Sequence, residues 1–242
     1  MGKEKKITVF MTKQEQFAGL CYLAFQNLLL PGVLRSMLTI LGVRQEDAVL
    51  NLLFFAVNFL ASAVLFRSFW SASLKAFAAN AWPCVWKAVA ALLVCKAAGL
   101  LLNLILQLWQ PDYFQNTVLG PALRNPNDQH IGQMIRSMPV LFGLATVFLV
   151  PPVEEALYRG LIFGTLYRKN RSIAYGVSVA LFAAVHLVGY LHLGDPMLLG
   201  LSFVQYIPPA LCLCFLYAST GSVLSPILMH MAYNAIGMLF VR

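Results

Sequence analysis

The sequence predicts an all-α fold: a polytopic transmembrane helical bundle of about seven spans, with the N-terminus in the cytoplasm. Of the 242 residues, 60% are hydrophobic and only 11% are charged, whereas a soluble domain has about 25% charged residues. The mean hydropathy is +0.75, and long apolar runs alternate with short polar segments. So little polar surface cannot cover a water-soluble globule, and we expect an integral, multi-pass membrane protein.

The predicted spans follow from the lengths of the apolar runs. A helix needs about 20 mainly apolar residues to cross a hydrocarbon core of ~30 Å. Pro31 and Gly32 are expected to break the first span into a helix and a shorter piece. The fourth is long for one crossing and is expected to tilt or to project from the bilayer. The seven segments are 17–41, 47–66, 84–108, 137–166, 172–190, 197–217 and 222–241.

The distribution of lysine and arginine predicts the orientation, because positive residues concentrate in cytoplasmic loops. Seven crossings place the basic cluster at 168–171 on the same side as the N-terminus, and the polar segment 109–136 on the opposite side, together with Arg44. Lys96 falls inside the third span, where a cation needs an explanation. The basic residues before the first span are Lys3, Lys5, Lys6 and Lys13.

Composition also excludes some classes of function. The net charge is +8, but nucleic-acid binding requires a basic stripe on a soluble surface, and here the basic residues punctuate apolar runs. We therefore expect membrane lipids as partners and no nucleic acid. Five scattered cysteines, an odd number, argue against a disulfide framework. His130 and His192 are expected to lie in loops and to face water.

The first group of candidate functional residues follows Pro151-Pro152 in the fourth span. An ionisable side chain inside a bilayer costs about 2.5–3.5 kcal/mol on insertion scales and is a functional candidate by default. Glu155 and Arg159 are four residues apart, so they share a helix face and can neutralise each other. Glu154 points elsewhere and lacks that partner. Its carboxylate is a candidate general base for a water molecule, and a buried ion network is the structural alternative.

Two further groups lie in later spans. His186 lies in an otherwise apolar helix, and His230 and Asn234 lie four residues apart on one helical face. An imidazole and an amide can both donate hydrogen bonds to a developing oxyanion, although such residues also join helices structurally. At 1.5 Å per residue, Glu154, His186 and His230 lie about 21, 21 and 12 Å from the expected cytoplasmic ends of their helices. This comparable depth favours one shared site.

Together these three groups resemble a known family. The pattern Glu-Glu-x-x-x-Arg at 154–159, Phe-x-x-x-His at 182–186 and His-x-x-x-Asn at 230–234 is similar to that of the CAAX-protease and bacteriocin-processing (CPBP, or Abi) family of intramembrane peptidases. The resemblance covers about 137–241. It divides the chain into N-terminal helices with an outer loop (1–136) and a catalytic helical core (137–242).

The resemblance implies hydrolysis of a peptide bond within the membrane by a CAAX-prenyl-protease-like endopeptidase. Glu154 is expected to activate water, His186 to orient it, and His230 with Asn234 to stabilise the oxyanion, with Glu155 and Arg159 in support. The substrate is expected to be a membrane-associated protein or peptide, either prenylated or with a leader. The family's small bacterial members, some linked to bacteriocin immunity, imply a bacterial plasma membrane.

Two alternatives remain open from the sequence. Glu154, His186 and His230 are also acceptable ligands for a divalent metal such as Zn²⁺, as in a metalloprotease, but the sequence lacks a His-Glu-x-x-His motif. Buried Glu and His residues also form proton relays in transporters, and the same cluster is compatible with a non-hydrolytic scaffold. Paired broken helices, which are typical of secondary transporters, are not evident in the sequence.

Overall fold

The structure, a computed structural model, describes residues 7–43, 46–117 and 120–239. Lys3, Lys5, Lys6 and Arg44, which contribute to the predicted orientation, lie outside these ranges, as does the end of the predicted span 222–241. In chain order the elements are α1 (Lys13–Leu28), α2 (Leu30–Ile40), α3 (Asp47–Leu65), α4 (Arg67–Ala78), α5 (Ala81–Trp109), η1 (Pro111–Tyr113), β1 (Phe114–Thr117), β2 (Gly120–Leu123), α6 (Pro126–Ser137), α7 (Pro139–Phe148), α8 (Val150–Glu154), η2 (Glu155–Phe163), α9 (Gly164–Tyr167), α10 (Arg171–Val185), η3 (Val188–Leu193), α11 (Pro196–Gln205), α12 (Ile207–Thr220) and α13 (Leu224–Met238).

Four helices in the described part of the chain are long and apolar enough to cross a membrane. They are α3, α5, the helix Pro139–Tyr167 formed by α7 to α9, and Pro196–Thr220 formed by α11 and α12. The bent pair of α1 and α2, which meet at 55°, qualifies as a fifth. This bend confirms the predicted break near Pro31, and the apolar helices confirm the all-α membrane class.

The remaining two predicted spans are shorter helices. The predicted span 172–190 corresponds to α10, which has 15 residues and leaves the α-helical conformation at His186. The predicted span 222–241 corresponds to α13, also with 15 residues. Both are shorter than the ~20 residues that a full crossing needs. The count of seven spans and the cytoplasmic N-terminus therefore stay predictions.

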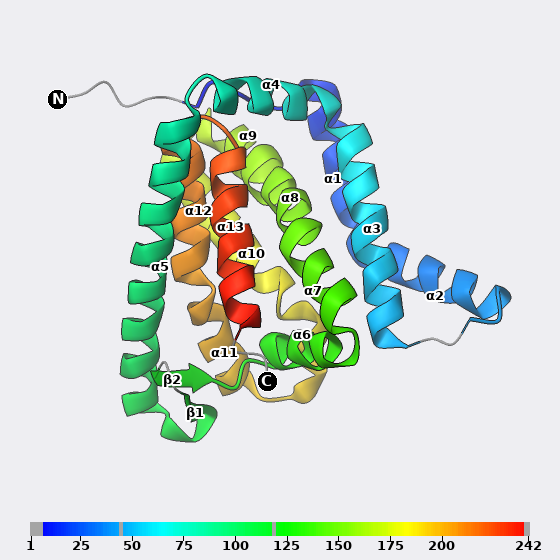
Figure 1. Cartoon of the computed structure of the whole chain (residues 1–242), viewed down its shortest axis with the longest axis vertical. Coiled ribbons are helices and arrows are strands. Elements are labelled where there is room, and N and C mark those ends of the chain that lie inside the picture. The colour runs from blue at the N-terminus through cyan, green and yellow to red at the C-terminus, as the bar shows by residue number, and fades with distance from the viewer. Residues whose placement is uncertain (1–6, 44–45, 118–119, 240–242) are drawn as a thin grey trace.

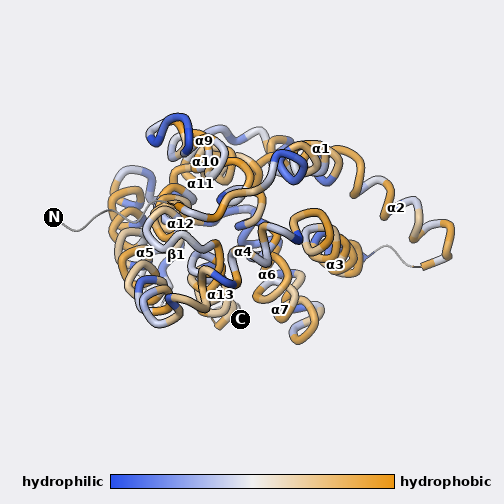
Figure 2. Tube along the Cα trace, turned by 90° about the horizontal axis from the view of Figure 1, so that it is seen from above, coloured by the Kyte–Doolittle hydropathy of each residue, from blue (hydrophilic) through white to orange (hydrophobic). Residues whose placement is uncertain are grey.

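The helices form a bundle with one helix across each end (Figure 1). The helices α10, α12 and α13 lie in the centre, with α5 on one side and the α7–α9 helix on the other; α1 and α3 lie beyond it, and α2 projects away. The short helices α4 and α6 cross opposite ends of the bundle. Hydrophobic residues colour most of the long helices in Figure 2, and outward-facing side chains such as Leu108 and Ile40 are more than four-fifths exposed. An apolar outer face of this kind fits a lipid environment.

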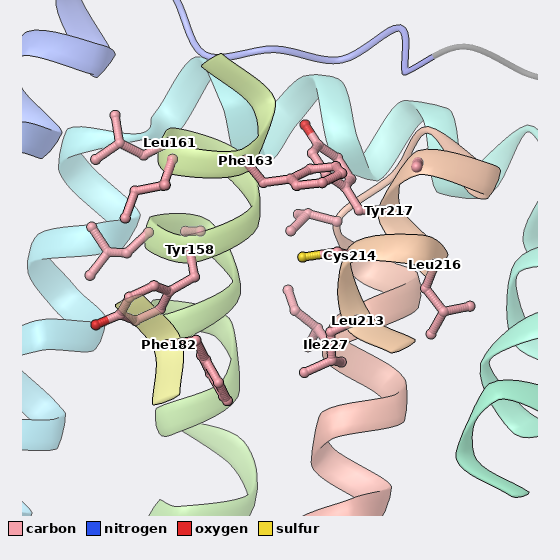
Figure 3. Packing of buried hydrophobic residues seen from close by; sticks show 14 of the residues in the cluster. Tyr158, Leu161, Phe163, Phe182, Leu213, Cys214, Leu216, Tyr217 and Ile227 are labelled. Carbon is pink, nitrogen blue, oxygen red and sulfur yellow. The ribbon is translucent and has the colours of Figure 1, made fainter. Parts of the chain in front are cut away.

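The interior of the bundle is packed around η2 and α12 (Figure 3). Phe163 and Tyr217 are fully buried and lie beside each other with ring centroids 6.2 Å apart. The hydroxyl of Tyr217 donates a hydrogen bond to the backbone oxygen of Val9 at 2.6 Å, which ties the segment before α1 to the core. A Cβ atom at Gly160 would lie 2.7 Å from the ring of Phe69, so this close approach of α4 to η2 requires a glycine.

The two lysines within the third predicted span have partners. The ammonium of Lys96 lies 3.5 Å from the centroid of the Tyr233 ring on α13, a cation–π contact that is stronger where water is excluded. Lys87 donates a hydrogen bond to the backbone oxygen of Ser219 at 3.0 Å. Both contacts join α5 to the central helices. The position of Lys96 inside a span is thereby explained.

The segment 109–136, which was expected to be an outer loop, contains a hairpin and a helix. The strands β1 and β2 pair antiparallel, with Phe114 opposite Leu123. Asn125 then caps α6, accepting a hydrogen bond from the N–H of Asn127 at 3.0 Å, a common way to start a helix. The prediction that His130 lies in a loop was wrong, because His130 lies within α6.

Candidate active site

Three helices bring the candidate residues together. Glu154 and Glu155 lie near the middle of the Pro139–Tyr167 helix, at the point where α8 passes into the π-helix η2. Pro151 and Pro152 lie within one turn before Glu154, and prolines inside a helix cannot donate backbone hydrogen bonds. Such π-helical segments are rare and frequently lie at functional sites. The local distortion thus falls on the acidic pair itself.

Glu154 lies between the two imidazoles. Its Oε1 is 3.9 Å from Nε2 of His186, and its Oε2 is 3.8 Å from Nε2 of His230. The side chain is 22% exposed, against 15% for His186 and 9% for His230. The buried Oε2 has no hydrogen-bond partner in the described part of the chain. These distances are too long for direct hydrogen bonds but are suited to a molecule held between the three groups.

Glu155 is the anchor of the site. Its carboxylate is fully buried and receives Nη1 of Arg159 at 3.2 Å, with Nε also 3.2 Å away. The same carboxylate lies 2.8 Å from Nδ1 of His230. Arg159 further donates to the backbone oxygen of Ala210 at 3.4 Å. The structure shows the predicted ion pair of Glu155 and Arg159. The same carboxylate also contacts His230 on α13.

The Nδ1 atoms of both histidines are fixed by acceptors. In His186, Nδ1 lies 2.7 Å from the backbone oxygen of Phe182, and in His230 it faces Glu155. A carbonyl and an ionised carboxylate can only accept hydrogen bonds, so each Nδ1 must carry the proton. The Nε2 atoms that face Glu154 are then acceptors in the neutral rings and donors only in doubly protonated rings.

Aromatic rings hold the two imidazoles in place. The ring of Tyr206 stacks on His186 with centroids 4.4 Å apart and planes at 28°. Phe182 contacts His186 at 4.7 Å and His230 at 6.1 Å, and the guanidinium of Arg159 lies 4.2 Å from the centre of the Phe182 ring. The Phe182 position in the sequence pattern therefore has a packing role beside both histidines.

Asn234 lies one helical turn beyond His230 and contacts a different partner. Its Nδ2 donates to the backbone oxygen of Thr146 on α7 at 3.1 Å, and no hydrogen bond within the described residues joins it to Glu154 or to either histidine. The structure thus brings Glu154, His186 and His230 together and places Asn234 beside them on α13. An amide nitrogen has two hydrogens, so one N–H remains for another acceptor.

A cavity opens on Glu154. It has a volume of about 100 Å³, lies between α1, α3 and α8, and includes Glu154, Val153 and Leu157 in its wall. A single water needs roughly 10–15 Å³ of such space. The cavity therefore has room for several water molecules beside the carboxylate.

The site contains residue types that bind metals, but the distances between these side chains fit a metal ion less well. No three His, Cys, Asp or Glu side chains in residues 7–43, 46–117 and 120–239 are arranged to hold a metal ion. Ligands about 2.0–2.2 Å from a tetrahedral Zn²⁺ would lie slightly closer together than Glu154 does to the two Nε2 atoms. Metal ligation by Glu154, His186 and His230 therefore stays a hypothesis.

Tyr206 lies outside the three sequence motifs, yet its ring covers His186. Its hydroxyl also accepts a hydrogen bond from Asn127 at 3.1 Å, which connects His186 to α6. A tyrosine next to the helix-breaking Pro208-Pro209 was the available signal.

Comparisons with known proteins match the same part of the chain. Residues 136–236 match the family model described as Type II CAAX prenyl endopeptidase Rce1-like. A protein of Bacillus subtilis (strain 168) named "Putative membrane peptidase YdiL" is 30% identical over 118 residues, which cover 48% of this chain and 43% of that protein. The chain thus matches less than half the length of this relative. No solved structure matches the chain. All of the candidate site residues lie within 136–236.

Proposed function

We propose that the protein is an intramembrane endopeptidase. The premise is that the C-terminal half of the chain belongs to the CAAX-protease and bacteriocin-processing family. The family match and the peptidase relative support hydrolysis of a peptide bond in a membrane. The observation that supports our choice of residues is the position of Glu154, between two oriented imidazoles and on the wall of a cavity.

In the proposed reaction Glu154 is the general base. A water held between Glu154 and Nε2 of His186 loses a proton to the carboxylate and attacks the scissile carbonyl carbon. The new C–O bond pushes the π electrons onto the carbonyl oxygen. When the tetrahedral intermediate collapses, the C–N bond breaks and the departing amine takes the proton back from Glu154. General base catalysis of this type contributes about 10²–10⁴-fold.

We assign His230 and Asn234 to the oxyanion. Because Nδ1 of His230 donates to Glu155, its Nε2 can donate to the oxyanion only when the ring is doubly protonated. Asn234 provides the amide hydrogen that Thr146 leaves unused. Glu155 and Arg159 are positioning residues, since they hold His230 and the helix.

The substrate we propose is a membrane-associated protein or peptide, in the plasma membrane of a bacterium. A prenylated C-terminus and a leader peptide are the two classes that the family suggests, and bacteriocin immunity is one setting for the second. Comparing peptide termini in membranes with and without active protein will identify the substrate directly.

A cleavage assay tests the proposal. The wild-type protein and Glu154→Gln, reconstituted in liposomes, are incubated with a mixture of quenched fluorescent peptides. We expect the wild type to cleave at least one peptide and Glu154→Gln to cleave the same peptide about 10²–10⁴-fold more slowly. Equal rates in the two proteins would refute the role of Glu154. No cleavage by the wild type, together with proton or solute flux through the liposomes, would favour the transporter alternative.

A further inference from the structure

The cavity beside Glu154 contains a second polar group that the proposed chemistry does not use. Gln26 on α1 is only 7% exposed and lines the same cavity as Glu154. It belongs to the N-terminal part of the chain, outside the residues that match the peptidase family. The question is what a buried amide does at this position.

The two buried amides of the cavity wall differ in their hydrogen bonds. Asn58 on α3 accepts from the hydroxyl of Tyr22 at 2.6 Å and donates to the backbone oxygen of Phe54 at 2.7 Å. Gln26 makes no side-chain hydrogen bond to any other described residue. Asn58 therefore has a structural role within the helices. Gln26 has both a donor and an acceptor group available to bind another molecule.

An unpaired buried amide is unfavourable, because water or a partner would normally satisfy it. In a membrane protein such polar groups mark substrate paths and sites. A glutamine amide has the same donor and acceptor groups as a peptide bond. It can therefore pair with the backbone of an extended peptide lying beside it, as a neighbouring strand would.

Most of the remaining wall is apolar. Phe54 and Phe55 on α3 line the cavity together with Leu157 and Val185 from other helices. The volume, about 100 Å³, is well below the roughly 300–1,000 Å³ of pockets that hold a whole drug-sized molecule. One apolar side chain and a few waters fit here, whereas a long lipid chain would have to lie against the outer surface of the bundle.

We propose that this cavity is the binding site for the substrate segment next to the scissile bond, and that Gln26 binds the backbone of that segment in an extended conformation. Phe54 and Phe55 then select an apolar residue there. The inference rests on the proposed peptidase function and adds to it a specificity-determining residue from the N-terminal helices, which the family match does not cover.

The test compares Gln26→Met with Gln14→Met. Methionine keeps the length of glutamine and removes the amide, and Gln14 is an exposed glutamine on the same helix. Loss of one neutral hydrogen bond that is equally strong in the ground and transition states should raise KM about three- to tenfold and leave kcat unchanged. The Tm of Gln26→Met should equal or exceed that of the wild type, because no internal hydrogen bond is lost.

Peptides with one backbone ester locate the contact. The best quenched peptide from the mixture is resynthesised with a single N–H replaced by oxygen at each position except the scissile bond. For the wild type and Gln14→Met, we expect one position to raise KM by the same three- to tenfold factor. For Gln26→Met, that ester should have no further effect, because the partner amide is already gone.

The results separate this inference from the proposed function. If the wild type cleaves peptides, Glu154→Gln cleaves them at least about 10²-fold more slowly, and Gln26→Met keeps the wild-type KM with every ester, the peptidase assignment stands and the role of Gln26 is refuted. A lowered Tm with an unchanged KM would make Gln26 a packing residue and would also refute it. If the wild type cleaves no peptide, both proposals fail together.

Discussion

The Nδ1 atom of His230 lies 2.8 Å from Oε1 of Glu155, and this contact joins α13 to the π-helix η2. Arg159 holds the other side of the same carboxylate. The position of His230 beside Glu154 therefore depends on a buried pair that does not line the cavity. Of the two neighbouring glutamates only Glu155 is paired with a cation, and for this reason we propose different roles for them.

Replacing Arg159 by methionine should destabilise the protein strongly. Glu155 would remain as a buried carboxylate without its arginine, and breaking a buried ion pair in this way costs about 3–5 kcal/mol. Thermal unfolding in detergent measures the effect. Lys75→Met, at an exposed position on α4, is the control and should stay within about 0.5 kcal/mol of the wild type. Equal melting temperatures for the two variants would argue against the anchor role of Glu155 and Arg159.

Asn234→Ala should leave a weak enzyme. Loss of one oxyanion donor lowers kcat by about 10²–10³-fold. Asn51→Ala on α3 is the control, because Asn51 also donates to a backbone oxygen, that of Asp47 at 2.8 Å, but is not part of the cavity wall. Its kcat should be unchanged. If Asn234→Ala lowers only the melting temperature and not kcat, then its bond to Thr146 is its whole function.

Tyr206 offers a test of how His186 is oriented. Tyr206→Phe keeps the ring that stacks on the imidazole, whereas Tyr206→Leu removes it. We expect Phe to retain kcat within about threefold and Leu to lose about tenfold, since stacked aromatic pairs contribute about 0.5–1.5 kcal/mol. Steady-state kinetics with one peptide measures both. A larger loss in Tyr206→Phe than in Tyr206→Leu would instead assign the effect to the hydroxyl.

Removal of metals should have no effect on the rate. The reaction derived above uses a carboxylate, two imidazoles and an amide, and the described residues hold no ready group of three metal ligands. We expect activity after prolonged dialysis against a chelator to stay within about twofold of the starting value, since a required metal would be lost together with the activity. Inactivation that is reversed by Zn²⁺ alone would contradict this and would make Glu154, His186 and His230 ligands.

The sequence predicted the local relationships of the site better than the long-range ones. The pairing of Glu155 with Arg159 follows from helical spacing, which is a local property. The contact of His230 with Glu155 depends on how two helices 75 residues apart in sequence pack, and no spacing rule contains that information. The hydrogen bond from Asn234 to Thr146 was missed for the same reason.

The spans show the same contrast. The break near Pro31 was predictable because proline acts locally, and the structure bends there. The early end of α10 at His186 was not predictable. The sequence stays hydrophobic through Leu187 and Val188, although the backbone turns there. Hydrophobicity predicts which segments are buried in lipid, but it does not predict where a short helix stops inside a bundle.

The most direct test of the shared site is a double-mutant cycle in kcat between Glu154→Gln and His186→Ala. Residues that act on one water are strongly non-additive, so we expect the double variant to be no slower than Glu154→Gln alone. Losses that multiply, so that the double variant is slower by the product of the two single effects, would contradict the account, because the two side chains would then act independently.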